Sequence, residues 1–260
     1  MNLPPEASGH SCFSMFQETI EFYDLLSFGL MSFASGPLVG VINFDRHIID
    51  SLKGTLESTE EVLLKGRIND AYMLLRKYYD IITINTYELI EGLEADARFE
   101  LLVGKIEAWF QGTTKLPPFK EMYLKIHSFK SLEEVNRILN ADTRYNEIRK
   151  RCNDHAHYNY FAYMELNSDI YYRGYAKLLA QFEKDMIALF IMHFAYLFTL
   201  RPYYMSSSDY LDALELRLKP EPGSKYWVAP FIQKCFDEIV KPNNGEIAEQ
   251  MTQSTYMKLS

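Results

Sequence analysis

Cysteine is scarce in this 260-residue chain: Cys12, Cys152 and Cys235 are the only three, and they lie far apart in the sequence. An odd number of widely spaced cysteines does not build a disulfide framework and is typical of a reducing compartment. The opening residues MNLPPEASGH also lack the basic start of a secretory signal peptide. We therefore expect a cytoplasmic protein.

Long hydrophobic runs are nearly absent. Residues 25–44 form a twenty-residue stretch without a charge, which is long enough to span a bilayer, but glycine, serine and a central proline dilute it. We expect a helix, a Gly-Pro break and a second helix there, and no membrane span. Residues 186–200 are strongly apolar over fifteen residues, which predicts a buried core helix.

Positive charge is in deficit, since the net charge is −8. That balance argues against broad electrostatic binding to nucleic acid or to a membrane surface. Residues 120–157 reverse the trend, with eight Lys or Arg against six Asp or Glu. A local basic site is therefore compatible with the acidic chain.

Several sequence motifs are missing as well. The chain has no G-x-x-x-x-G-K, no G-x-G-x-x-G after a strand, no G-x-S-x-G and no H-E-x-x-H. These absences argue against a P-loop ATPase, a dinucleotide enzyme, an α/β-hydrolase and a zincin. We expect neither a cofactor nor a metal.

Alternating strand patterns are scarce, and capping signals with 3.6-residue periodicity predict helices along most of the chain. Ser131 with Glu134 predicts a capping box, and Asp142 is predicted to cap the helix that follows it. The last fifteen residues are predicted to be frayed. The longer predicted helices cover about 17–34, 43–64, 67–92, 95–111, 142–158, 169–201 and 227–240.

These helices predict an all-α fold, an antiparallel bundle of long helices joined by short connections. We expect residues 43–202 to form the core bundle. Residues 1–42 and 203–260 are expected to be helical N- and C-terminal extensions.

The segment IRKRCNDHAHYNYF (148–161) concentrates the chemistry. On a helix, Arg151 and His155 share one face, as do Asn153 and His157. Arg151 and His157 lie roughly 120° apart around the axis and about 9 Å apart along it. Glu147 is placed to pair with Arg151, and Asn153 to hydrogen-bond the ring of His157.

Arginine with histidine, and no metal set, suits cleavage of RNA. Histidine exchanges protons near neutral pH, and arginine presents a fork of donors that matches phosphate oxygens. RNA supplies its own nucleophile, the 2′-hydroxyl. The candidate catalytic residues are Arg151, His157, Asn153 and His155.

The stretch from Arg151 to His157 resembles the R-x(4–6)-H signature of HEPN domains, with five residues between Arg and His. Residues 64–84, with a Lys-Gly turn followed by A-x-x-L-L-R-x-x-x-D, are also similar to a helix pair in HEPN-like proteins. Cys152 departs from the family pattern, in which a polar residue usually follows the arginine. The resemblance covers about residues 43–202.

The resemblance implies a metal-independent endoribonuclease that leaves a 2′,3′-cyclic phosphate. It implies a homodimer, and a toxin or antiviral effector with an antitoxin or defence-system protein as partner. His157 would be the general acid and base, Arg151 would clamp the scissile phosphate, and Asn153 would orient groups. The surroundings of His157 resemble the family pattern more than those of His155.

Other interpretations stay open. His155 competes with His157, because it shares a face with Arg151 and also follows Arg149 at the R-x(5)-H spacing. The cluster also fits a solvated helix end in a non-catalytic helical adaptor. A metal site of Cys152, His155 and His157 lacks a fourth ligand. Elsewhere, His193 is predicted to be a core histidine, and Arg76 with Asp80 a structural ion pair.

Overall fold

The computed structural model describes residues 5–32, 39–94, 104, 108–109, 111–167 and 174–260. Within these residues the regular structure is helical, apart from one isolated antiparallel bridge between Ser206 and Val228. The predicted all-α fold is therefore confirmed. In the described residues, no helix is both long enough and apolar enough to cross a membrane.

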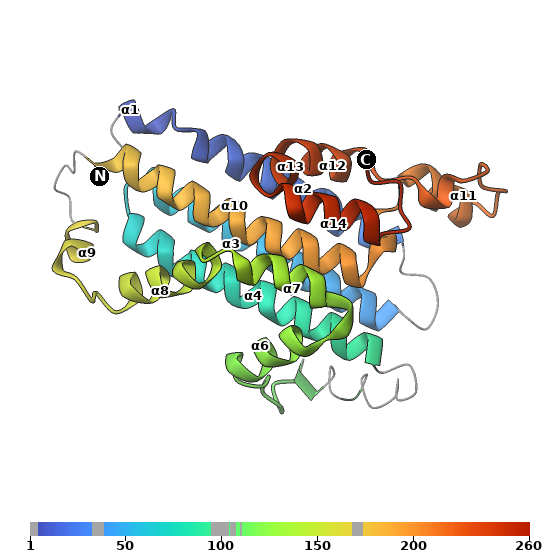
Figure 1. Cartoon of the computed structure of the whole chain (residues 1–260), viewed down its shortest axis with the longest axis horizontal. Helices are drawn as coiled ribbons and strands as arrows, with labels where there is room; N and C mark the ends of the chain where they lie inside the picture. Colours follow the sequence, from blue (N-terminus) through green and yellow to red (C-terminus); the bar gives the residue numbers. More distant parts are fainter. Residues whose placement is uncertain (1–4, 33–38, 95–103, 105–107, 110, 168–173) are drawn as a thin grey trace.

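Four long helices form the body of the molecule (Figure 1). They are α2 (Ser11–Ser32), α3 (Val39–Leu64), α4 (Ile68–Glu94) and α10 (Tyr175–Leu200). Helix α2 packs on α3, α3 on α4, α4 on α10, and α10 back on α2. Helices were predicted at all four places, although the start of the fourth, from residue 169, lies outside the described residues.

The direction of α10 differs from the prediction of an antiparallel bundle. Helices α2 and α3 run antiparallel, as do α3 and α4, because short connections join them. Helix α10, however, runs parallel to α4. Its first residue, Tyr175, bonds Gly66 just before α4, and Arg201 just after α10 bonds Leu89 near the end of α4. The smaller helices between α4 and α10 in the sequence bring the chain back to the end of the bundle where α4 begins, so α10 starts from that end.

Those smaller helices cover one side of α4 and α10 (Figure 1). They are α6 (Phe119–Ser128), a 3₁₀ turn (Lys130–Leu132), α7 (Glu133–Ala141) and α8 (Arg144–Ala156). The short helix α9 (Phe161–Glu165) follows α8 and lies at the left end of the view in Figure 1. Helix α8 packs directly on α4 and also contacts α10. The predicted Ser131 capping box is wrong, because α7 begins after Leu132 and has no side-chain cap. Asp142 accepts the backbone N–H of Arg144, but the N-cap of α8 is Thr143, one residue later than predicted, and it makes no side-chain cap bond.

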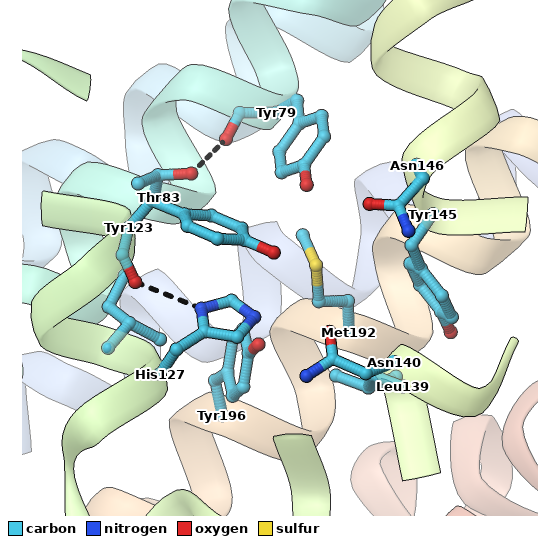
Figure 2. A pocket seen from close by; sticks show the side chains of 11 residues that line it. Tyr79, Thr83, Tyr123, His127, Leu139, Asn140, Tyr145, Asn146, Met192 and Tyr196 are labelled. Atoms are coloured by element: carbon cyan, nitrogen blue, oxygen red, sulfur yellow. Dashed lines mark hydrogen bonds between the residues drawn. The ribbon is translucent and has the colours of Figure 1, made fainter. Parts of the chain in front are cut away.

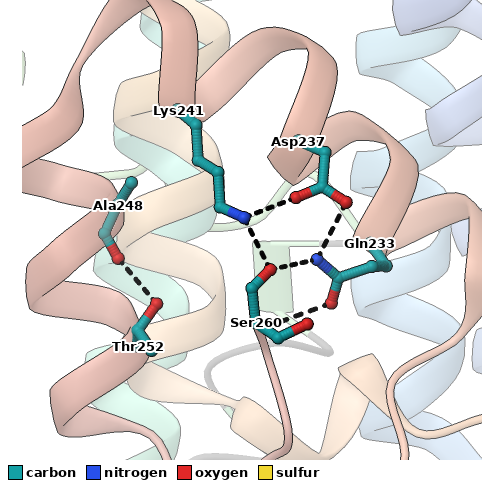
Figure 3. Close-up of polar contacts among 6 residues, drawn as sticks. All are labelled: Gln233, Asp237, Lys241, Ala248, Thr252 and Ser260. Carbon is teal, nitrogen blue, oxygen red and sulfur yellow. Dashed lines mark hydrogen bonds and ion pairs between the residues drawn. The ribbon is translucent and has the colours of Figure 1, made fainter.

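The C-terminal part of the chain folds back against the same body. It contains 3₁₀ turns at Pro202–Met205 and Ser224–Tyr226, α11 (Ser208–Glu215), α12 (Pro230–Cys235), a π-helical turn (Phe236–Val240), α13 (Lys241–Asn243) and α14 (Gly245–Ser254). The predicted fraying of the last fifteen residues is wrong. Ser260 is held by hydrogen bonds to Gln233 and Lys241 (Figure 3).

Helix α10 is apolar on all sides because it is covered on all sides. From Asp185 to Phe198 every residue is buried. The ring of Phe194 packs against those of Phe198 and Phe236, with centroids 4.7 and 6.2 Å away. One hydrophobic cluster extends from Ala7 to Leu259, so the expected extensions and the expected core bundle share one core.

A chain of polar groups crosses this core. The hydroxyl of Tyr78 lies 2.6 Å from that of Tyr23, which lies 2.8 Å from Nδ1 of His193. Nε2 of His193 lies 2.9 Å from Oδ1 of Asn85. Burial lowers the pKa of His193 to about 3, so the ring is neutral. The prediction of a core histidine is confirmed.

Candidate functional site

Helix α8 directs Arg151 toward α10. Nε and Nη2 of Arg151 donate to the carboxylate of Asp185 at 2.7 and 3.2 Å. The side chain of Asp185 is 3% exposed and that of Arg151 is 26% exposed. Burial by itself would lower the pKa of Arg151, but the hydrogen bonds and the charge of Asp185 raise it above the ordinary value. Arg151 is therefore charged and held in one orientation.

Asp185 is the centre of a hydrogen-bond network. Besides Arg151, it accepts a bond of 3.2 Å from the hydroxyl of Tyr72 and one of 2.9 Å from Nε2 of Gln181. A buried carboxylate needs such partners, because an unpaired one costs several kcal/mol, on the order of 3–5. Nη1 of Arg151 forms no hydrogen bond with any described residue. Its two N–H groups are therefore available to an oxygen from outside.

His155, one turn after Arg151, is enclosed. Its ring lies between those of Tyr72 and Tyr163, with centroids 4.1 and 4.0 Å away and planes 15° and 26° apart. Nδ1 lies 2.9 Å from Oδ1 of Asn69, and the residue is 2% exposed. Burial first, and then the charge of Arg151, lower its pKa to about 4. His155 is therefore a neutral, stacked imidazole whose Nδ1 donates to Asn69.

His157 lies at the opposite extreme of exposure. It caps the C-terminus of α8, its backbone N–H donates to the carbonyl of Asn153 at 3.0 Å, and its side chain is exposed. The predicted side-chain bond from Asn153 to the His157 ring is not formed. Oδ1 of Asn153 is buried and has no hydrogen-bond partner among the described residues. His157 is thus open to solvent and unconstrained by Asn153.

The turn after His157 carries backbone strain. Tyr158 has a φ of +48°, in the left-handed region that favours glycine. The N–H of Tyr158 bonds the carbonyl of His155, and that of Asn159 bonds the carbonyl of Asp154. This pair of bonds is the Schellman motif, which usually has glycine where Tyr158 stands. The motif sends the chain away from α8 immediately after His157.

Exposed apolar side chains follow His157. Tyr158, Tyr160, Phe161 and Met164 are 40%, 58%, 74% and 50% exposed. Single exposed apolar residues are ordinary, but a run of four around one turn is a surface on which another molecule can pack. We call these four residues the α8–α9 aromatic patch.

Arg149 lies on another face of α8. It bonds Asp80 at 2.8 Å, and its guanidinium carbon lies 3.4 Å from the centroid of the Phe119 ring. Asp80 also pairs with Arg76 at 3.8 Å, which confirms the predicted ion pair on α4. The alternative pairing of Arg149 with His155 is therefore not formed.

The predicted pairing of Glu147 with Arg151 is not formed. Arg151 pairs instead with Asp185, which is distant in the sequence. Cys152 is fully buried, and burial raises the pKa of its thiol to about 12. It therefore lies inside α8 while His157 lies outside. Among the described residues no three His, Cys, Asp or Glu side chains are grouped as metal ligands.

Four residues of the cluster were missed by sequence reasoning: Asp185, Tyr72, Asn69 and Tyr163. One signal pointed to Asp185. It is an acidic residue at the edge of the apolar run 186–200, and a charge in that place needs a partner. The other three give no local signal, because their positions only meet α8 in the folded chain.

The cluster thus unites Arg151 with His155 around Tyr72 and leaves His157 and Asn153 outside that network. No model of a known protein family, no curated protein and no solved structure matches this chain.

Proposed function

We propose that this protein is a metal-independent endoribonuclease of the HEPN type, with the turn at the end of α8 as its active site. One observation carries the proposal. Nε and Nη2 of Arg151 both donate to Asp185, which fixes the orientation of the guanidinium group. Nη1 forms no hydrogen bond with any residue that the structure describes. An arginine held in this way offers a preorganised donor pair to a phosphate oxygen.

The proposed reaction needs no other reagent than RNA. The 2′-oxygen attacks the adjacent phosphorus, the bond to the 5′-oxygen breaks, and a 2′,3′-cyclic phosphate and a 5′-hydroxyl result. A histidine accepts the proton of the 2′-hydroxyl, and the leaving 5′-oxygen takes up a proton. Arg151 stabilises the negative charge that builds up on the phosphate oxygens.

We assign the proton transfer to His157 rather than to His155. Exposure supports this choice, because His157 is open to solvent and His155 is enclosed by two tyrosine rings and 2% exposed. The low pKa of His155, about 4, also makes it a weak base at neutral pH. His155 and Asn69 would then position α8 against α4.

The test is cleavage of total RNA in EDTA, with mapping of the fragment ends. The wild type should give 2′,3′-cyclic phosphate ends, and His157→Ala should cut at least ~100-fold more slowly. Arg151→Lys keeps a charge opposite Asp185 but loses the fork, so it should fold and cut poorly. Lys150→Ala, an exposed neighbour of the same charge, should cut nearly as the wild type does. Wild-type cleavage by His157→Ala would contradict the assignment.

The resemblance also supports a homodimer, and a toxin or antiviral role with an antitoxin or defence-system protein as partner. Light scattering after size exclusion measures the first of these. A monomer that cleaves RNA would contradict the dimer and leave the chemistry standing.

A non-catalytic helical interaction module is the second candidate. The observation that favours this candidate is that the contacts of Arg151 and His155 serve the fold. Arg151 neutralises buried Asp185, and His155 stacks on Tyr72 and bonds Asn69. In that case wild-type protein leaves RNA intact, and the α8–α9 aromatic patch contacts another protein. The supporting result would then be a co-expressed protein that binds the wild type and no longer binds Phe161→Ser.

A further inference from the structure

A small pocket opens where α6, α7 and α8 meet α4 and α10 (Figure 2). The free space between its lining atoms is about 410 Å³, including the open mouth. The enclosed space as a whole has room for only about one or two water molecules, so most of a larger ligand would lie in the open mouth. Tyr79 and Met192 lie at the inner end, and Asn140 and Asn146 are exposed at the mouth.

Polar groups converge on this space from several helices. Figure 2 shows the hydroxyls of Tyr79 and Tyr123 and a ring nitrogen of His127 directed toward it. The hydroxyls of Tyr79 and Tyr123, and the side-chain amides of Asn140 and Asn146, form no hydrogen bond with described residues. The other ring nitrogen of His127 is held by the carbonyl of Tyr123 at 2.9 Å. Hydrogen-bonding capacity is thus left unused on all sides of one cavity.

The walls are flat and apolar. The rings of Tyr123 and His127 are stacked, with centroids 3.8 Å apart, and form one continuous wall. Met192 at the floor is 5% exposed and has the flexible side chain that adapts to different shapes. A mostly aromatic pocket with a few convergent polar groups is the usual form of a small-molecule site.

The charge of the lining limits the ligand. No Lys, Arg, Asp or Glu lines the pocket. Arg149, one turn along α8 from the lining residues Tyr145 and Asn146, is already paired with Asp80 and lies against Phe119. A charged ligand group would find no counterion here, and its desolvation would oppose binding. The ligand is therefore a neutral group with donors and acceptors on its edge.

We propose that this pocket binds a planar heteroaromatic ring of the nucleobase type, as a free nucleoside or as a base of single-stranded RNA. Aromatic side chains stack on the faces of such rings, and asparagine amides match their edges. A flat ring would insert one edge between the walls and rest its remaining atoms in the open mouth against Tyr123 and His127. Tyr79 and Tyr72 are seven residues apart on α4, so the pocket lies two turns, about 10 Å, from the Arg151 cluster.

The test follows Met192 by NMR in protein with labelled methionine methyl groups, at neutral pH. Adenosine, guanosine, cytidine and uridine are titrated separately, followed by short single-stranded RNA homopolymers. We expect ring-current shifts of the Met192 methyl with at least one base. Saturation by a nucleoside alone identifies a free ligand, whereas a response only to homopolymers identifies an RNA base.

Two variants and one control make the assignment specific. Asn146→Trp, at an exposed helical position, should cover the mouth, and Tyr123→Phe removes only a hydroxyl. Each should raise the dissociation constant about tenfold or more. Tyr256→Phe alters an exposed tyrosine outside the pocket and should bind as the wild type does. Absence of any Met192 shift, or unchanged binding by Asn146→Trp, would overturn the proposal.

This proposal does not depend on RNA cleavage. His157→Ala should bind the ring as the wild type does, and a protein that cuts no RNA can still shift Met192. Conversely, cleavage that persists without any Met192 shift would refute the pocket and leave the endoribonuclease intact.

Discussion

The carboxylate of Asp185 lies 2.7 Å from Nε of Arg151, and it is the buried member of a pair whose other member reaches the surface. Removing one partner of a buried pair is strongly destabilising, because the other loses its compensation. Asp185→Ala should therefore lower the free energy of unfolding by roughly 3 kcal/mol or more. Urea denaturation measures the change.

The exposed pair of Lys241 with Asp237 is the matched control for that measurement. Their side chains are 42% and 45% exposed, so Asp237→Ala should cost no more than ~1 kcal/mol. An equal loss in both variants would contradict the structural role of Asp185.

Acid should weaken the fold between pH 6.5 and 4. The pKa of His155 is lowered from 6.5 to about 4 in the folded chain, and that of His193 to about 3. In this range the unfolded chain binds protons that the folded chain does not, so the stability falls as the pH falls. His155→Phe keeps a ring between Tyr72 and Tyr163, and its stability should change less steeply over this range. Urea midpoints at several pH values provide the comparison, and a His155→Phe slope equal to that of the wild type would contradict the prediction.

Glycine at position 158 should stabilise the protein. Tyr158 has a φ of +48°, a conformation that costs a non-glycine residue on the order of 1 kcal/mol. Tyr158→Gly should raise the thermal unfolding midpoint by a few degrees. Tyr160, two residues later, has an extended φ of −129°, so Tyr160→Gly should lower the midpoint. A fall in both variants would argue against strain at Tyr158.

The contribution of Asp45 to stability should change with pH in the opposite direction to those of His155 and His193. Burial raises its pKa to about 6, although a hydrogen bond from Tyr204 and the charge of Arg201 act to lower it. A raised folded pKa means that its stabilisation is complete below pH 3.8 and lost as the pH rises through about 6. Asp45→Asn should gain stability relative to the wild type between pH 4 and pH 7. A difference that is constant with pH would contradict the burial of an ionising Asp45.

The fold was largely predictable because its signals are local. The Lys65-Gly66 stop is one example. Gly66 has a φ of +74°, and the N–H of Arg67 bonds the carbonyl of Val62, so α3 ends in the motif that glycine favours. Helix α14 was missed although Asn244 caps it by accepting the N–H of Ile247, because its Asn-Gly start is also a turn signal.

The site was less predictable because its partners are distant in the chain. Periodicity correctly put Arg151 and His155 on one face of α8. Periodicity could not indicate that α10 brings Asp185 to Arg151, or that α4 brings Asn69 to His155. Helical spacing favoured Glu147 as the partner of Arg151. Arg151 pairs with Asp185 instead, because a buried carboxylate needs a cation more than an exposed one does.

The polar chain from Tyr78 through Tyr23 and His193 to Asn85 joins α2, α4 and α10. These four groups meet at only one axial setting of the three helices. Any slip would leave two hydroxyls and an imidazole unsatisfied in the core. The network therefore fixes the register of three helices at once, and the N-terminal helix α2 is needed to complete it.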